Sequence, residues 1–235
     1  MTHIFDTYEA MSRAAAEAIY TCIQADPGLL ICPASGNSPR MTYDLVAGQI
    51  RENGLKHALR MIALDEWVGM SQDNPHSSGY QLKAQLSGPL GIEDAFLFDG
   101  NYADEATEIR RADDFLLQNG PIDLCILGIG TNGHLGLNEP ADFLTPPVHR
   151  ARLAESTRGH LMVAGSAFKP EYGITLGMKD ILASKKILLL VNGAHKIAVM
   201  TNFFSRKIST QLPASFLWLH PDVTCLCDRA AVPEL

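Results

Sequence analysis

The sequence predicts an α/β fold, in which a mostly parallel sheet carries helices on both faces. Short apolar runs typical of buried strands alternate along the chain with segments whose apolar residues recur at helical spacing. Polar, glycine-rich clusters follow several of these apolar runs. The 235 residues contain no low-complexity linker, internal repeat or sharp shift in composition. We therefore expect residues 1–235 to form a single Rossmann-like domain.

The first third of the chain shows the alternation of helix and strand. Residues 7–24 carry an apolar stripe at helical spacing, which Asp26-Pro27-Gly28 closes. A buried strand is expected over 29–32, and Pro39 suits the first turn of a second helix. A second strand is expected over 60–64.

The later elements continue this order. Because ligands of parallel sheets bind beyond the carboxyl ends of the strands, the polar clusters at those ends are expected to form one site. We expect further strands at 95–98, 122–127, 174–176, 187–191 and 223–227, and helices at 80–86, 105–117, 179–183 and 196–204.

Composition limits the classes of partner. A net charge of -7 argues against a nucleic-acid-binding protein, although backbone amides and one or two cations can still hold a phosphate. The five cysteines show no CxxC pair or Cys/His spacing typical of a metal site, and reduced thiols are typical of the cytoplasm. No stretch of 18 consecutive apolar residues and no amino-terminal targeting signal is present, so no membrane partner is expected.

The segment Leu124–Pro140 (LCILGIGTNGHLGLNEP) runs from a predicted strand into a glycine-rich turn. It brings Asn132, His134 and Glu139 close together, and a histidine beside an amide and a carboxylate can act as an oriented acid or base. Residues 128–133 also match the GxGxxG pattern of dinucleotide-binding proteins. Glycine and proline interrupt the helix that this pattern should open, and no following strand ends in the expected acidic residue, so we rank that function low.

Three more clusters follow predicted strands. The run Ser35-Gly36-Asn37-Ser38 precedes a helix and suits phosphate binding, although a strand-to-helix turn with a serine cap fits it equally well. Asp65 and Glu66 are candidates for a base with a raised pKa, although a solvated acidic loop is the commoner explanation. Lys196 opens a helix, against the helix dipole, and so indicates an anionic ligand unless it is an ordinary exposed lysine.

Together these motifs resemble the glucosamine-6-phosphate deaminase family, and within it the galactosamine-6-phosphate deaminase/isomerase branch. The resemblance rests on SGNSP, LDEWVG, GIGTNGHLGLNEP, GITLGMKDIL, LLLVNGAHK and LPASFLWLH. The related 6-phosphogluconolactonases share the GxGxxGH frame but lack the Asn-Glu-Pro ending that stands at 138–140, so lactone hydrolysis ranks second. A non-catalytic sugar-phosphate-binding regulator is a third alternative, which the presence of both Asp65 and His134 disfavours.

The resemblance implies conversion of galactosamine 6-phosphate or glucosamine 6-phosphate and water to a ketohexose 6-phosphate and ammonia, with no metal or organic cofactor. Asp65 would move a proton from C2 to C1, His134 would open the sugar ring, and Glu139 would orient His134. The phosphate would be held by Ser35, Gly36, Asn37, Ser38 and Lys196.

The sequence departs from the family pattern at two places. Asn132 stands where glucosamine-specific members typically carry aspartate, and we interpret it as a feature of the galactosamine branch. The phosphate arginine of the family is matched loosely by Arg150, Arg152 or Arg158, of which we prefer Arg158. The chain ends soon after residue 227, so the allosteric control of some hexameric relatives is not expected; the oligomeric state and the epimer preference stay open.

Overall fold

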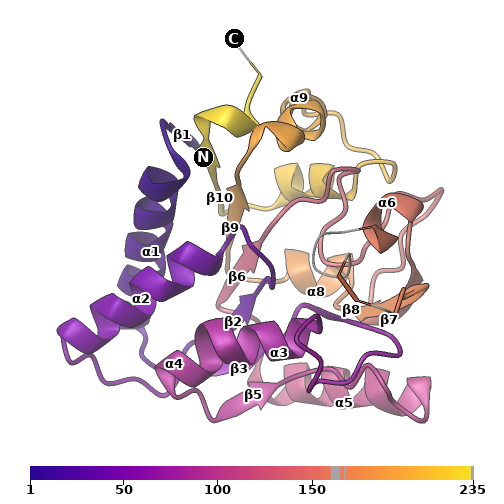
Figure 1. The fold of residues 1–235 in the computed structure, drawn as a ribbon, viewed down its shortest axis with the longest axis horizontal. Helices are drawn as coiled ribbons and strands as arrows, with labels where there is room; N and C mark the ends of the chain where they lie inside the picture. The colour runs from indigo at the N-terminus through magenta and orange to yellow at the C-terminus, as the bar shows by residue number, and fades with distance from the viewer. Residues whose placement is uncertain (160–164, 167, 234–235) are drawn as a thin grey trace.

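A parallel seven-stranded sheet forms the centre of the computed structural model, which describes residues 1–159, 165–166 and 168–233. The strand order is β1-β10-β9-β6-β2-β3-β5, and each neighbouring pair is parallel (Figure 1). The α/β fold predicted from the sequence is confirmed. The strands are β1 (Thr2–Phe5), β2 (Leu30–Pro33), β3 (Arg60–Ile62), β5 (Asp94–Phe96), β6 (Leu124–Leu127), β9 (Lys186–Val191) and β10 (Val223–Asp228).

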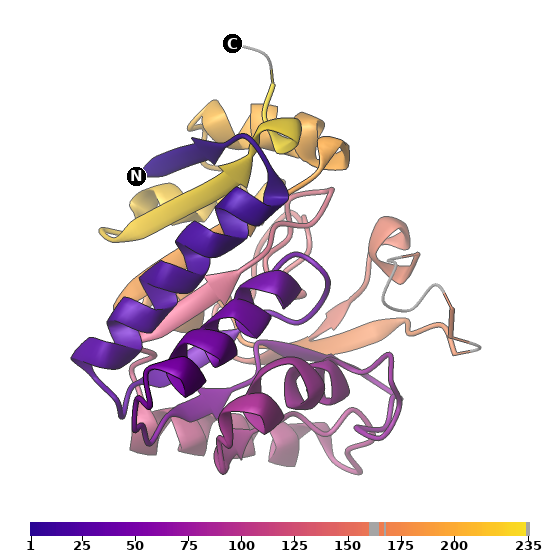
Figure 2. The ribbon, with the colours of Figure 1, turned by 60° about the vertical axis from the view of Figure 1, so that its left-hand side comes forward.

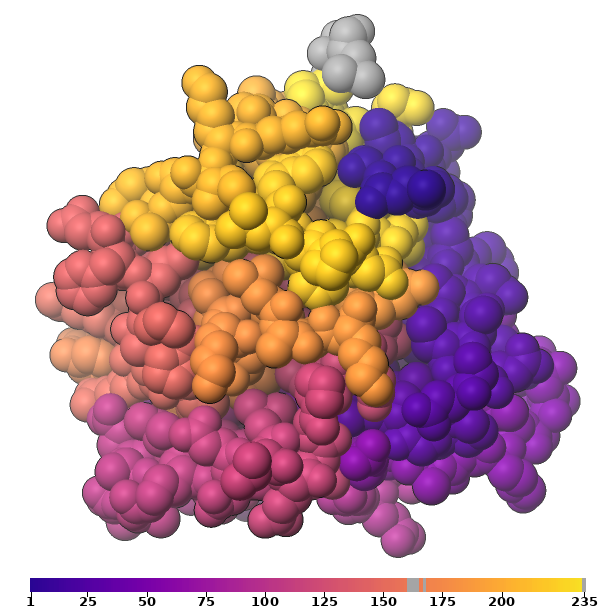
Figure 3. Space-filling model, turned by 180° about the vertical axis from the view of Figure 1, so that it is seen from behind, coloured from indigo at the N-terminus to yellow at the C-terminus, as the bar shows by residue number. Residues whose placement is uncertain are grey.

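Helices cover both faces of this sheet. Figure 2 shows α1 (Tyr8–Ala25) and α2 (Arg40–Glu52) side by side in front of the sheet and α5 (Glu105–Asn119) behind it. Seen from behind, the orange and yellow C-terminal third of the chain lies between the indigo N-terminal part and the pink central part (Figure 3). The other helices are α3 (Ser78–Leu82), which continues into a π-helical turn (Lys83–Ser87), α4 (Gly88–Leu90), α6 (Glu155–Arg158), α8 (Met178–Leu182) and α9 (Ile197–Phe204).

Helix α1 shows how the sequence pattern becomes an element. The Thr7 side chain accepts the backbone N–H of Ala10 and so caps the first turn, as threonine often does at this position. The apolar stripe of α1 is buried against the sheet, as the helical spacing predicts. Residues of this stripe that are 1% exposed or less include Met11, Ala15, Ile19 and Ile23.

A second, antiparallel sheet stands beside the main one. It consists of β4 (Asp65–Trp67), β8 (Tyr172–Thr175) and β7 (His149–Arg152) in the order β4-β8-β7. The strand expected at 174–176 therefore belongs to this small sheet and not to the parallel one. Its own apolar cluster consists of Trp67, Met70, Leu137, Ala151 and Leu153.

Other departures from the sequence prediction are local. Strand β3 ends at Ile62, two residues before the end of the predicted strand over 60–64, and β4 of the small sheet begins at Asp65. Cys225 and Cys227 lie on the same side of β10 with their Sγ atoms 3.4 Å apart, and all five cysteines are free thiols. In the part of the chain that the structure describes, no helix is long and apolar enough to span a membrane.

The strand order places a crevice beside β2 and β6. From β2 the chain moves to β3 on one side, whereas from β6 it moves toward β9 on the other side. Such a reversal leaves a crevice at the carboxyl ends of the two adjacent strands, where parallel sheets bind ligands. The SGNSP segment follows β2 and the glycine-rich turn follows β6, so both open at this crevice.

Candidate active site

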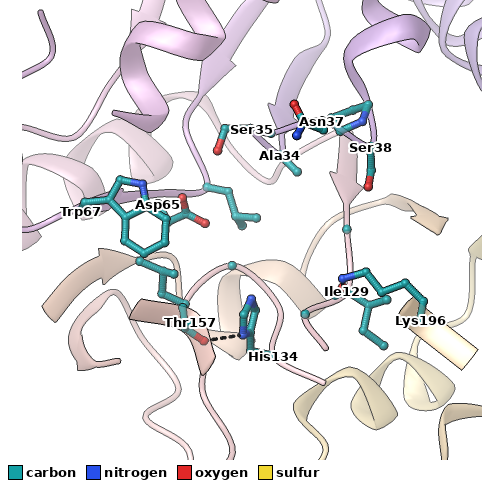
Figure 4. A pocket seen from close by; sticks show the side chains of 17 residues that line it. Ala34, Ser35, Asn37, Ser38, Asp65, Trp67, Ile129, His134, Thr157 and Lys196 are labelled. Atoms are coloured by element: carbon teal, nitrogen blue, oxygen red, sulfur yellow. Dashed lines mark hydrogen bonds between the residues drawn. The ribbon is translucent and has the colours of Figure 1, made fainter. Parts of the chain in front are cut away.

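A pocket lies at this crevice and brings together clusters from distant parts of the sequence. In Figure 4, Ser35, Asn37 and Ser38 form one edge, and Asp65 and Trp67 lie at one end with Lys196 at the other. His134 and Thr157 form the edge opposite the serines. The pocket is lined by Ala34, Ser35, Gly36, Asn37, Ser38, Pro39, Leu64, Asp65, Trp67, Gly128, Ile129, Gly130, His134, Gly136, Leu137, Thr157 and Lys196.

Asp65 faces this pocket from the start of β4, where it is paired with Thr175 of β8. Its Oδ1 accepts a hydrogen bond of 2.9 Å from the Ser78 hydroxyl. Burial raises the pKa of Asp65 to about 6, while the Ser78 hydrogen bond and the nearby His134 charge lower it. The carboxylate is therefore more basic than usual and still ionised near neutral pH, as a proton-abstracting group requires.

Glu66 has a different task, which the sequence could not separate from that of Asp65. Its side chain is 1% exposed and accepts the backbone N–H groups of Trp67, Ser78 and Gly79 at 2.8, 3.0 and 2.8 Å. Burial raises the pKa of Glu66 to about 7, and the three N–H donors act against that shift. Glu66 thus ties the first turn of α3 to β4 and lies outside the pocket lining.

Two glycines bring the turn after β6 close to the reacting groups. A Cβ atom at Gly130 would lie 2.4 Å from the His134 ring, so the ring rests against bare backbone. Gly136 has φ of +56°, and a Cβ there would lie 2.8 Å from Thr175 Oγ1 and 3.4 Å from Asp65 Oδ2. Glycine is therefore required where this turn meets β4 and β8.

His134 is oriented by two polar side chains. Its Nδ1 lies 3.5 Å from Glu139 Oε2 and 3.2 Å from the Thr157 hydroxyl. Burial raises the pKa of Glu139, but the hydrogen bonds from His134, Thr157 and Asn132 and the histidine charge together outweigh this, so its net pKa is lowered. Glu139 is thus an anionic partner that can support a protonated His134.

Asn132 acts on Glu139 rather than on the imidazole. Its Nδ2 donates to Glu139 Oε2 at 2.7 Å, and its Oδ1 accepts the backbone N–H of His134 at 3.2 Å. The other carboxylate oxygen, Glu139 Oε1, accepts the backbone N–H of Ala154 at 3.2 Å. Asn132 and Glu139 therefore stand behind His134 and do not line the pocket themselves.

Thr157 is a residue that sequence reasoning missed. It lies on α6, is 2% exposed, and lines the pocket beside His134. The helix has only four residues, so it carries no periodic pattern that could mark one buried face.

Lys196 occupies the end of the pocket away from Asp65. Its side chain is 8% exposed, and its Nζ donates to the Ile129 carbonyl at 2.6 Å. Burial lowers the pKa of this lysine. An ammonium that has three N–H donors, in a pocket edged by serine hydroxyls, suits an anionic group such as a phosphate.

The backbone before Lys196 is held by Asp228. The N–H of Gly193, whose φ is +89°, donates to both carboxylate oxygens of Asp228 at 3.0 and 3.1 Å. Asp228 also accepts the N–H of Ala231 at 2.8 Å and is 6% exposed. The carboxylate therefore joins the end of β10 to the turn that carries Lys196.

The three arginines considered for phosphate binding do not line the pocket. Arg158 ends α6 with an exposed side chain. Arg150 lies over the Tyr172 ring at 3.8 Å and forms an ion pair of 3.5 Å with Glu105. Arg152 is exposed on β7.

Comparison with known proteins gives a consistent result over most of the chain. The family model for glucosamine-6-phosphate isomerases and 6-phosphogluconolactonase matches residues 5–225. An Escherichia coli K12 protein named "Putative deaminase AgaI" is 37% identical over 223 residues, covering 94% of this chain and 89% of that protein. The glucosamine-6-phosphate deaminase of Geobacillus sp. WCH70 is 35% identical over 234 residues, covering 96% and 92%.

Solved structures show the same similarity in three dimensions. A monomeric glucosamine-6-phosphate deaminase superimposes with a TM-score of 0.91 at 32% identity, covering 98% of both chains. A 6-phosphogluconolactonase from Trypanosoma brucei superimposes with a TM-score of 0.72 at 20% identity, covering 98% of this chain and 97% of that one. The second comparison shows a shared fold.

Proposed function

This chain belongs to the family of glucosamine-6-phosphate isomerases and 6-phosphogluconolactonases, and we propose that it is an amino-sugar-phosphate deaminase. The reaction converts galactosamine 6-phosphate or glucosamine 6-phosphate and water to a ketohexose 6-phosphate and ammonia. One observation carries the proposal: Asp65 and His134 both face a pocket whose far end holds Lys196, with the serine-rich loop along one edge. The pocket thus has an acid/base end and an anion end.

The anion end orients the substrate. The 6-phosphate would lie between the loop Ser35–Ser38 and the Lys196 ammonium, where hydroxyl and N–H donors converge. C1 and C2 then lie toward Asp65 and His134. Arg158 belongs to the proposal only if α6 moves toward a bound phosphate, because its exposed side chain does not line the pocket.

The acid/base end performs two proton transfers. His134, supported by Glu139, moves the proton that opens the pyranose ring. The Asp65 carboxylate then removes the proton from C2 and returns it to C1, while a proton passes from the amino nitrogen to the C1 oxygen. C1 thereby becomes an alcohol and C2 an imine. Water adds at C2 and ammonia leaves, which balances the reaction without a metal or an organic cofactor.

Lactone hydrolysis is the less favoured activity. The deaminases compared above are 32–37% identical to this chain, whereas the Trypanosoma brucei lactonase is 20% identical. The Asn138-Glu139-Pro140 ending places Glu139 against His134, and Asn138 ties the turn down by donating to the Leu135 and Leu176 carbonyls at 2.9 Å. We also propose a cytoplasmic location, in which the five free thiols would stay reduced.

The direct test measures ammonia and ketose 6-phosphate released from each of the two epimeric amino-sugar 6-phosphates. We expect both products in equal amounts from at least one epimer. A folded protein that releases no ammonia from either epimer contradicts the proposal. Hydrolysis of 6-phosphogluconolactone in the same preparation would instead support the alternative.

A further inference from the structure

A chain of hydroxyl groups connects the serine-rich loop to Asp65. The Ser35 hydroxyl donates to the Ser78 hydroxyl at 3.2 Å, and Ser78 donates to Asp65 Oδ1 at 2.9 Å. Figure 4 shows the Ser35 side chain turned toward the Asp65 side of the pocket. Ser78 is absent from the pocket lining, so it reaches the substrate only through these two side chains.

Ser78 is held in place more firmly than an ordinary surface serine. The residue is 1% exposed, and its backbone N–H donates to the buried Glu66 carboxylate at 3.0 Å. The same carboxylate binds the next N–H, of Gly79, at 2.8 Å. Adjacent carboxyl groups of β4 therefore fix the two ends of Ser78: Glu66 holds its backbone and Asp65 receives its hydroxyl.

The direction in which each hydroxyl donates follows from the acceptor at the end of this row, the Asp65 carboxylate. A serine hydroxyl has one proton, and an ionised carboxylate can only accept. Ser78 must give its proton to Asp65 while Asp65 is ionised, and it is then free to accept from Ser35. Hydrogen bonds in such a row strengthen one another, so a change at Ser35 reaches Asp65 through Ser78.

We propose that Ser78 is a positioning residue, which fixes the Asp65 carboxylate for proton transfer and couples it through Ser35 to the phosphate-binding loop. This inference rests on the proposed deaminase function. Ser78 itself does not touch the substrate. A phosphate that draws the Ser35 hydroxyl to itself would weaken the bond from Ser78 to Asp65 and make the base stronger once the substrate is in place.

The test compares the acid limb of the kcat/KM–pH profile for ammonia release in three variants. In Ser78→Ala the ionised carboxylate loses its donor, so we expect the limb to move up by about one pH unit and kcat on the plateau to fall about tenfold. Ser35→Ala should move the limb in the same direction by a smaller amount and also raise KM. Ser78→Thr keeps the hydroxyl and should restore the limb toward its wild-type position.

Ser77→Ala is the matched control. The Ser77 hydroxyl caps the same helix by accepting the Tyr80 N–H at 2.9 Å, and it is not among the groups that hydrogen-bond to Asp65. Its loss should lower the melting temperature and leave the acid limb unchanged. If the acid limb lies at the same pH in Ser78→Ala and Ser77→Ala, Ser78 only stabilises the helix, and the proposal is overturned.

A second measurement separates this inference from the proposed function. The Asp65 carboxyl carbon can be titrated by NMR in protein labelled with carbon-13 aspartate, with Asp65→Asn identifying the signal. The titration midpoint should rise in Ser78→Ala, with or without ammonia release by the wild type. An unmoved midpoint contradicts the role of Ser78 even in an active deaminase, whereas a moved midpoint in a protein without activity contradicts the proposed function alone.

Discussion

At Asp65, burial favours the protonated acid, while the Ser78 hydrogen bond favours the ionised carboxylate. Burial has the larger effect and leaves the pKa at about 6. Activity that depends on the ionised form should therefore rise with pH through about 6, and Asp65→Asn should abolish ammonia release. Substrate should still bind to Asp65→Asn, because the phosphate-binding residues are untouched. Calorimetric titration with substrate checks this, and lost binding would give Asp65 a structural role.

The same carboxyl group should cost the protein stability at neutral pH. Its pKa is raised from 3.8 to about 6 on folding, so the folded state holds the proton more tightly than the unfolded state. The corresponding stability is fully present below pH 4 and is lost as the pH rises through 6. At pH 8 we expect Asp65→Asn to be more stable than the wild type by roughly 2–3 kcal/mol, from about 1.4 kcal/mol per pKa unit. Urea unfolding at pH 4 and pH 8 measures this; equal gains at both pH values would contradict it.

Asn132 offers a second test at the level of one residue. Its Nδ2 donates to Glu139 Oε2 at 2.7 Å, so Asn132→Asp would place two carboxylates in that contact. Repulsion requires both carboxyl groups to be ionised, and protonation of either one at lower pH relieves it. We expect the melting temperature of Asn132→Asp to fall further below the wild type at pH 8 than at pH 5. Asn132→Ala, which loses the hydrogen bond without adding charge, should show a deficit that changes little with pH.

At the scale of elements, the turn before Lys196 depends on the end of β10. Asp228→Ala would leave the partly buried N–H of Gly193 and the buried N–H of Ala231 without their acceptor. Each such loss typically costs about 1–3 kcal/mol, and a turn that is no longer held would displace Lys196. We expect KM for the sugar phosphate to rise about tenfold or more, with a smaller change in kcat.

A remote helix cap provides the control for Asp228. Asp104 caps α5 by accepting the Thr107 N–H at 2.8 Å, and it lies outside the pocket lining. Asp104→Ala should lower the melting temperature and leave KM unchanged. If both variants changed KM equally, general loss of stability rather than the position of Lys196 would explain the effect.

The sequence predicts an element well when the residues that determine it lie within one segment, and poorly when it depends on pairing with a distant segment. Helix α1 and the strands β2, β6 and β9 follow from apolar patterns within one segment, and their predictions were confirmed. Strands β4 and β7 were missed because both contain charged residues and each pairs with β8, which lies far from β4 in the sequence.

The same limit applies to the site. The pocket joins Asp65, His134, Lys196 and the serine-rich loop, whose polar clusters the sequence placed at strand ends. Ser78 and Thr157 went unnoticed because each acts through a contact with a residue 13 or 23 positions away, which no local spacing reveals. The exposed placement of Arg150, Arg152 and Arg158 likewise depends on how β7 and α6 pack, not on their charge.

On the scale of the whole molecule, the site spans two sheets. The small sheet joins the main core through Ile174 of β8 and also has an apolar cluster of its own. The serine-rich loop, His134 and Lys196 extend from strands of the parallel sheet, whereas Asp65 belongs to the antiparallel sheet. Trp67, Leu137 and Leu153 belong to the separate apolar cluster of the small sheet. The position of the base therefore depends on both apolar clusters, while the anion end depends on the main core.

This division predicts that the small sheet can be weakened without unfolding the parallel sheet. Leu153 is 4% exposed in the smaller cluster, and Leu153→Ala should cost about 2–4 kcal/mol there. We expect faster amide hydrogen exchange in β7 and β8 and little change in β9. We also expect kcat to fall, because β8 pairs with β4, which carries Asp65. Leu189→Ala, which removes a fully buried side chain from β9, should instead speed exchange throughout both sheets. Equal acceleration of β8 and β9 in Leu153→Ala would mean that the two sheets open as one cooperative unit.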